Sequence, residues 1–95
     1  MCGIFGFNWA DKFLLQKGLM EIKHRGPDAS GSFSDGKMSL GHNRLSIVDL
    51  SENGKQPMSD SDGLIWIIFN GEIYNHKELR QELKQQHDFK SSSDT

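Results

Sequence analysis

Cys2 is the residue in this sequence best placed to do covalent chemistry, because it directly follows the initiator methionine. Cysteine is small enough for methionine aminopeptidase to remove Met1 and leave Cys2 as the first residue. The freed α-amino group would be partly unprotonated near neutral pH and within reach of its own thiol. One residue could then supply both nucleophile and base, although its position alone is more typical of a small buried apolar side chain.

A second candidate group is Asn70-Gly71-Glu72, which follows the apolar run Leu64 to Phe69. A side-chain amide, an open backbone N–H and a carboxylate at the end of a strand are the parts of an oxyanion hole beside an ammonium site. Asn-Gly is also a common turn dipeptide, so a simple turn fits the same residues.

Two further motifs allow a structural and a functional interpretation. Arg44 can be an exposed strand residue or a bidentate clamp for a carboxylate, and the pattern leaves both open. The segment His24 to Asp28, with Gly31 after it, has the Gly, Pro and Asp of a rigid turn, which needs no catalytic purpose.

Several other site classes are not expected. The four histidines, His24, His42, His76 and His87, lack the spacing of a helical zinc site, so we expect no metal site and solvated or structural roles. There is no Walker-type loop, and Gly3 to Gly6 lacks the third glycine of a dinucleotide fingerprint, so we expect no nucleotide bound by this segment.

Composition indicates which classes of binding partner and which cellular compartment to expect. The 95 residues carry 11 Lys and Arg against 13 Asp and Glu, a net charge of -2, which disfavours nucleic-acid binding. The longest strongly apolar run is far shorter than the roughly 20 residues that cross a bilayer, so we expect a soluble, cytoplasmic protein with no membrane partner. A single cysteine excludes an internal disulfide.

The first half of the chain predicts a strand, a helix and a hairpin. Cys2 to Phe7 is short and apolar with two glycines, which predicts a buried strand, and Lys12 to Lys23 has Leu15, Leu19 and Ile22 at helical spacing. Asp35-Gly36 readily adopts a tight turn, which predicts a hairpin between Ser32 to Ser34 and Met38 to Leu40. Arg44 to Leu50 continues as β-prone sequence.

The second half predicts one more strand and one more helix. Leu64 to Phe69 shows no alternation and is rich in Ile, so we expect a strand buried on both faces. Asn75 is expected to cap a helix, with Glu78 completing a capping box and Leu79 and Leu83 forming an apolar stripe. The order of elements predicts a mixed α and β fold with the sheet in the middle.

Six ordered motifs together resemble the N-terminal glutaminase domain of glutamine-hydrolysing asparagine synthetases, a class II, N-terminal-nucleophile glutamine amidotransferase. The resemblance spans the whole chain, and Pro27-Asp28 and Glu72 to Asn75 favour this branch over relatives that make phosphoribosylamine or glucosamine phosphate. The motifs are Met1 to Gly6, His24 to Asp28, Gly41 to Asp49, Gln56 to Met58, Phe69 to Asn75 and Ser93-Asp94.

The resemblance implies an α+β fold, an αββα sandwich of two antiparallel sheets flanked by helices, and a role for each matching residue. Cys2 would attack the side-chain amide of glutamine to form a thioester, and Asn70 and Gly71 would hold the oxyanion. Arg44 would bind the α-carboxylate of glutamine, and Glu72 and Asp94 its α-ammonium group. Backbone groups of four residues would line the pocket: Leu45, Ser46, Ile47 and Val48.

In the family, the ammonia passes to a C-terminal synthetase domain that uses ATP and magnesium to make asparagine from aspartate. We expect residues 1–95 to be the N-terminal part of the glutaminase domain, with the rest of that domain and the synthetase domain absent. A homodimer of the full-length form is compatible with the resemblance. We expect an incomplete sandwich to expose Ile65, Ile67 and Phe69. The alternatives are a non-catalytic fragment, an amidotransferase with another acceptor, and a small module that pairs through a sheet edge.

Overall fold

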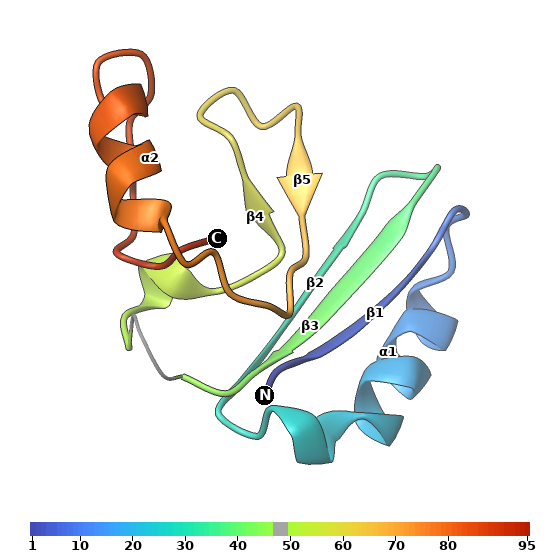
Figure 1. The fold of residues 1–95 in the computed structure, drawn as a ribbon. Helices are drawn as coiled ribbons and strands as arrows, with labels where there is room; N and C mark the ends of the chain where they lie inside the picture. The colour runs from blue at the N-terminus through green and yellow to red at the C-terminus, as the bar shows by residue number, and fades with distance from the viewer. Residues whose placement is uncertain (47–49) are drawn as a thin grey trace.

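The computed structural model describes residues 1–46 and 50–95, and these form an α+β fold (Figure 1). Three antiparallel strands in the order β1-β3-β2 make the larger sheet, and β4 pairs with β5 in a second, two-stranded sheet. The elements are β1 (Gly3–Phe7), α1 (Lys12–Glu21), β2 (Ala29–Ser34), β3 (Ser39–Arg44), β4 (Met58–Ser59), β5 (Trp66–Ile67) and α2 (His76–Leu83), with 3-10 turns at Lys23–Arg25 and Glu52–Gly54.

The helix α1 packs against the larger sheet and forms the core with it. The Asp11 carboxylate caps its start by accepting a 2.9 Å hydrogen bond from Leu14 N. Leu15 and Leu19 are buried against the sheet, with only 1% and 3% of their surface exposed. A β-carbon on Gly18 would lie 2.1 Å from the Phe5 ring, so a glycine is needed where the helix meets β1. The predicted helix and the predicted first strand are confirmed, but the expected burial of the strand is not, since Ile4 is 46% exposed.

The hairpin around Asp35-Gly36 is also confirmed. It joins β2 to β3, and the Asp35 carboxylate accepts hydrogen bonds from Lys37 N and Met38 N, each 3.0 Å long. Gly36 has a φ of +91°, a conformation that favours glycine. This turn lies at the end of β3 that is opposite to Arg44.

The expectation that Arg44 to Leu50 continues as a strand is wrong for Leu45 and Ser46. β3 ends at Arg44, where its pairing with Ala29 of β2 ends. The backbone of the next two residues turns instead toward side chains: Leu45 N donates to Cys2 Sγ, and Ser46 N donates to the Asp28 carboxylate. Residues 47–49 lie outside the described part.

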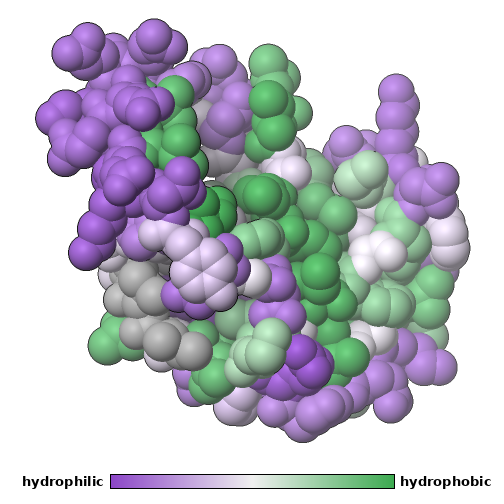
Figure 2. Space-filling model, in the orientation of Figure 1, coloured by the Kyte–Doolittle hydropathy of each residue, from purple (hydrophilic) through white to green (hydrophobic). Residues whose placement is uncertain are grey.

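Leu64 to Phe69 is not a long strand buried on both faces. Only Trp66–Ile67 pairs, with Met58–Ser59, and Leu64, Ile65 and Ile67 are 82%, 70% and 44% exposed. The cause is a turn: the Asp60 carboxylate accepts hydrogen bonds from Leu64 N and Ile65 N, and Gly63 has a φ of +71°. The expected exposure of Ile65 and Ile67 is confirmed, whereas Phe69 is half-buried. Figure 2 shows hydrophobic surface gathered over the middle of this face of the molecule.

Helix α2 begins where the sequence predicts, but without the predicted capping bonds. Asn75 occupies the N-cap position with φ -97° and ψ 25°, and its side chain makes no capping hydrogen bond. A capping side chain reaches the N–H of the third helical residue from an extended backbone, and Asn75 does not have this backbone conformation. The predicted stripe is only partly covered, since Leu79 and Leu83 remain 38% and 40% exposed.

Among the described residues, no helix is long and apolar enough to cross a membrane. The expected combination of helices with antiparallel sheet is confirmed as an α+β fold.

Candidate active site

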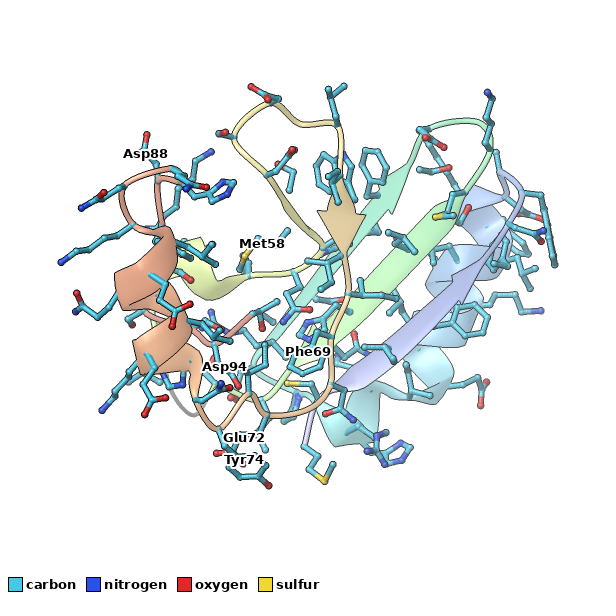
Figure 3. All side chains as sticks on the ribbon, turned by 45° about the horizontal axis from the view of Figure 1, so that its top comes forward. Met58, Phe69, Glu72, Tyr74, Asp88 and Asp94 are labelled. Atoms are coloured by element: carbon cyan, nitrogen blue, oxygen red, sulfur yellow. The ribbon has the colours of Figure 1, made fainter. Side chains whose placement is uncertain are left out.

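A cavity of about 430 Å³ lies where the N-terminus, the end of β3 and the C-terminal segment meet. Figure 3 shows Glu72, Tyr74 and Asp94 gathered on one side of the molecule near Phe69, with Asp88 well away from them. The cavity therefore joins residues from both ends of the chain. Its lining is Met1, Cys2, His42, Arg44, Leu45, Gly54, Gln56, Asn70, Gly71, Glu72, Tyr74, Ser93, Asp94 and Thr95.

Cys2 lies just before β1, and its thiol is fixed by the backbone that follows β3. Its Sγ accepts a hydrogen bond from Leu45 N at 3.3 Å and lies 3.6 Å from Leu45 O. Its carbonyl accepts a 3.2 Å bond from Arg25 Nε. The side chain is half-buried and lines the cavity, so the thiol is held in place while one side of it faces open space.

Arg44 is buried in the wall of the cavity, which argues against the exposed-strand interpretation. Only 7% of its surface is exposed, and its Nη1 donates a 2.7 Å hydrogen bond to Ser51 O. No carboxylate among the described residues forms an ion pair with it. A buried guanidinium in the cavity wall can donate hydrogen bonds and offer a positive charge to an anionic ligand.

The turn that contains Gly26 and Asp28 positions the backbone at the end of β3. Asp28 N donates to Arg44 O at 2.9 Å, and Ser46 N donates to Asp28 Oδ2 at 2.8 Å. A β-carbon on Gly26 would lie 2.1 Å from Asn43 O. The segment predicted as an ordered turn therefore holds Arg44, Leu45 and Ser46 in place. Of the four residues predicted to line the pocket with their backbone, Leu45 does so, whereas Ser46 is not among the lining residues. Ile47 and Val48 lie outside the described residues.

Asn70, Gly71 and Glu72 all line the cavity, as does Asp94 from the far end of the sequence. The Asp94 carboxylate accepts a 2.7 Å hydrogen bond from Ile73 N, which ties the two segments together. Neither the Asn70 side chain nor the Gly71 N–H donates a hydrogen bond to another described residue. Two donors and two carboxylates thus face the same cavity as the Cys2 thiol.

His42 lines the same cavity and is a site residue that the sequence analysis missed. It is 1% exposed, and neither ring nitrogen has a hydrogen-bond partner among the described residues. Burial lowers the pKa of His42, the Phe69 backbone opposes this shift, and the charge of nearby Arg44 adds to it. The lowered pKa favours the uncharged imidazole near neutral pH, and the ring is buried rather than solvated.

Four other polar lining residues were also missed: Gln56, Tyr74, Ser93 and Thr95. Gln56, Tyr74 and Ser93 each lie within one of the six ordered motifs, which could have marked them, whereas Thr95 carries no such signal. No group of three or more His, Cys, Asp or Glu residues in the described ranges is arranged to hold a metal ion. The arrangement can instead present a thiol to a small zwitterion bound between Arg44 and the two carboxylates.

The sequence of the chain is similar to that of glutamine amidotransferases. The family model described as a glutamine amidotransferase domain matches residues 1–95. The chain is 49% identical to the glutamine-hydrolysing asparagine synthetase 1 of Bacillus subtilis and 42% identical to that of Lotus japonicus. These alignments cover 100% and 99% of this chain but only 16% and 17% of the relatives.

A third relative, an amidase of Penicillium rubens, is 44% identical over 84% of this chain and 12% of its own length. The match to the family model extends over every residue that lines the cavity, from Met1 to Thr95. This chain therefore belongs to the glutamine amidotransferase domain family.

Proposed function

We propose that this chain binds glutamine and releases its side-chain nitrogen as ammonia through a thioester on Cys2. The observation that carries the proposal is one cavity of about 430 Å³ that gathers Cys2, Arg44, Asn70, Glu72 and Asp94 from distant parts of the sequence. A nucleophile, hydrogen-bond donors and charges of both signs are what an amide of an α-amino acid requires.

The charged residues account for binding of the substrate backbone. Arg44 receives the α-carboxylate, and Glu72 and Asp94 receive the α-ammonium group. Leu45 contributes to the wall, and we propose that Ser46, Ile47 and Val48 add backbone groups to it when glutamine binds. The glutamine side chain then extends toward the Cys2 thiol.

The chemistry proceeds in two balanced steps. The Cys2 sulfur bonds to the amide carbon, the C–N bond breaks, and the thiol proton leaves with the nitrogen as ammonia. Water then adds to the thioester carbon, the C–S bond breaks, and glutamate leaves while the thiol regains a proton. Asn70 and the Gly71 N–H hold the oxyanion in both steps.

Removal of Met1 is part of this proposal. The α-amino group of Cys2 carries the proton between the thiol and the departing ammonia, and a peptide bond to Met1 would leave an amide without useful basicity. Met1 itself lines the cavity and is 71% exposed, so its removal also widens the opening.

The whole protein is proposed to use this ammonia to make asparagine from aspartate. The chain spans about 16% of the length of the Bacillus subtilis relative, whose name describes it as an asparagine synthetase. In the longer polypeptide, further residues would complete an αββα sandwich and supply an ATP- and magnesium-dependent synthetase domain, compatible with a homodimer.

The test is glutamate and ammonia release from glutamine by the natural polypeptide that carries these residues, together with its Cys2→Ala and Cys2→Ser variants. Wild-type protein that has lost Met1 is expected to release both products in equal amounts, and both variants to release neither. Asparagine formation with aspartate and ATP tests the acceptor. Release that persists in Cys2→Ala, or no release by correctly processed protein, would contradict the proposal.

A further inference from the structure

Gln56 is a buried side chain to which neither the sequence nor the proposed chemistry gives a role. It is 7% exposed, in the wall of the cavity. Its Oε1 accepts a 2.6 Å hydrogen bond from Phe69 N, and its Nε2 donates a 3.1 Å bond to Thr95 Oγ1. One carboxamide therefore connects two segments that lie 26 residues apart in the sequence.

Each of these bonds ends one residue away from a group in the proposed mechanism. Phe69 precedes Asn70, whose amide and the next N–H are the proposed oxyanion donors, and Thr95 follows Asp94. The Asp94 carboxylate in turn accepts a bond from Ile73 N. The hydrogen bonds thus close a ring that runs from Gln56 through the segment 69–73 to the segment 94–95 and back.

The ring is anchored to the larger sheet by the backbone of Gln56. A β-carbon on Gly31 would lie 2.1 Å from Gln56 O, so this carbonyl lies directly against β2. β2 pairs with β3, which carries His42 and Arg44. Gln56 therefore fixes the position of the proposed oxyanion donors relative to the sheet that carries His42 and Arg44.

We propose that Gln56 is a positioning residue that sets the oxyanion segment and the Asp94 segment relative to each other. The expected effects on kcat and KM rest on the proposed function, whereas the two hydrogen bonds of Gln56 do not depend on it. The bond to Phe69 N governs the alignment of the oxyanion donors and hence kcat. The bond to Thr95 governs the ammonium site and hence KM.

The experiment compares three variants of the natural polypeptide. Gln56→Met keeps the length of the side chain and removes the hydrogen bonds to both Phe69 N and Thr95 Oγ1. Thr95→Val removes only the bond to residue 95, and Thr95→Ser keeps the hydroxyl group that accepts it. Gln56→Met is expected to lower kcat for glutamate release about 10- to 100-fold. Thr95→Val is expected to raise KM about three- to tenfold with kcat within about twofold, and Thr95→Ser to return KM to the wild-type value.

Amide hydrogen exchange gives a readout that does not depend on activity. Exchange at Phe69 N is expected to be about tenfold faster in Gln56→Met and unchanged in Thr95→Val. Gln85→Met is the matched control, because Gln85 is exposed and forms no hydrogen bond with the described residues through its side chain. It should leave kcat, KM and exchange unchanged.

Two results would overturn the inference: unchanged exchange at Phe69 N in Gln56→Met, or the same kcat and KM for Gln56→Met and Thr95→Val. If Gln56→Met does not fold, an unchanged KM in Thr95→Val would also overturn the inference. A wild-type protein that releases no glutamate contradicts the proposed function instead, and the exchange experiment still decides the role of Gln56.

Discussion

Replacing Gly26 with alanine tests whether the turn after α1 holds the end of β3 in position. The added β-carbon would lie 2.1 Å from Asn43 O and 2.6 Å from Arg44 N, whereas ordinary van der Waals contact begins at 3.4 Å. The turn and the strand must therefore separate by about 1.3 Å, the difference between the shortest of these distances and contact. Gly26 has φ -150°, so the change introduces a steric clash without backbone strain.

Two measurements should respond together. Overpacking of this kind costs about 1 to 3 kcal/mol of unfolding free energy, which urea denaturation measures directly. Arg44 and the Leu45 backbone beside the Cys2 thiol would move with the strand, and a displacement of about 1 Å at a reacting site costs on the order of 100-fold in rate. Glutamate release should fall by that factor in the part of the variant protein that remains folded.

Gly36→Ala is the matched control. Gly36 has a φ of +91° with no atom within 4 Å of an added β-carbon, so alanine there strains the backbone without a clash. It should cost about 1 kcal/mol of stability and leave glutamate release unchanged, because this turn lies at the opposite end of β3. Wild-type stability and activity in Gly26→Ala would refute the reasoning.

Three further predictions concern single side chains of the site and its supports. Arg80 donates 2.9 Å hydrogen bonds to Ser91 O and Ser93 O, so Arg80→Ala should loosen the segment before Asp94, cost about 1.5 kcal/mol in urea denaturation and raise KM for glutamine. Asn70→Ala should lower kcat about 100- to 1,000-fold with little change in KM, and an unchanged kcat would remove Asn70 from the oxyanion hole. Because the pKa of His42 is lowered in the folded protein, the unfolded chain takes up its proton first, near pH 6.5. The unfolding free energy should therefore fall as pH drops below about 6.5, by at most about 1.4 kcal/mol per pH unit from this group, and His42→Gln should show a shallower fall. Equal pH slopes for the two proteins would contradict this assignment.

The elements that could be predicted are those whose local signals agree with their packing. In α1 the spacing of Leu15 and Leu19 coincides with the face that the sheet covers, and Asp11 caps the start. The hairpin at Asp35-Gly36 is fixed by its own carboxylate and glycine. Local chemistry is sufficient in both cases.

The strand Leu64 to Phe69 could not be predicted from its apolar residues alone. Apolar side chains gain free energy from burial, but the turn at Asp60 and Gly63 limits the pairing of β5 with β4 to two residues, and Leu64 N and Ile65 N donate to the Asp60 carboxylate. The run Asp60-Ser61-Asp62-Gly63 is a turn signal that could have revealed the hairpin between β4 and β5. A local bond to a carboxylate here outweighs the preference of the side chains.

The candidate site could be predicted as a set of residues but not as a geometry. Cys2, Arg44, Asn70, Glu72 and Asp94 were named from motifs, and all five line one cavity. Gln56 and His42 were missed as site residues because their contributions depend on contacts between distant segments. The positions of these polar side chains in the site depend on residues that are distant in the sequence and close only in the folded chain.

The most direct test of the proposed thioester chemistry is a search for the acyl-enzyme on Cys2. The natural polypeptide is mixed with glutamine, quenched in acid within the first turnovers and digested, and the N-terminal peptide is weighed by mass spectrometry. We expect a peptide that begins at Cys2 and carries a γ-glutamyl group, which is absent without glutamine. Glutamate release with no such adduct under any quench time, or an adduct on another residue, would contradict the proposed chemistry.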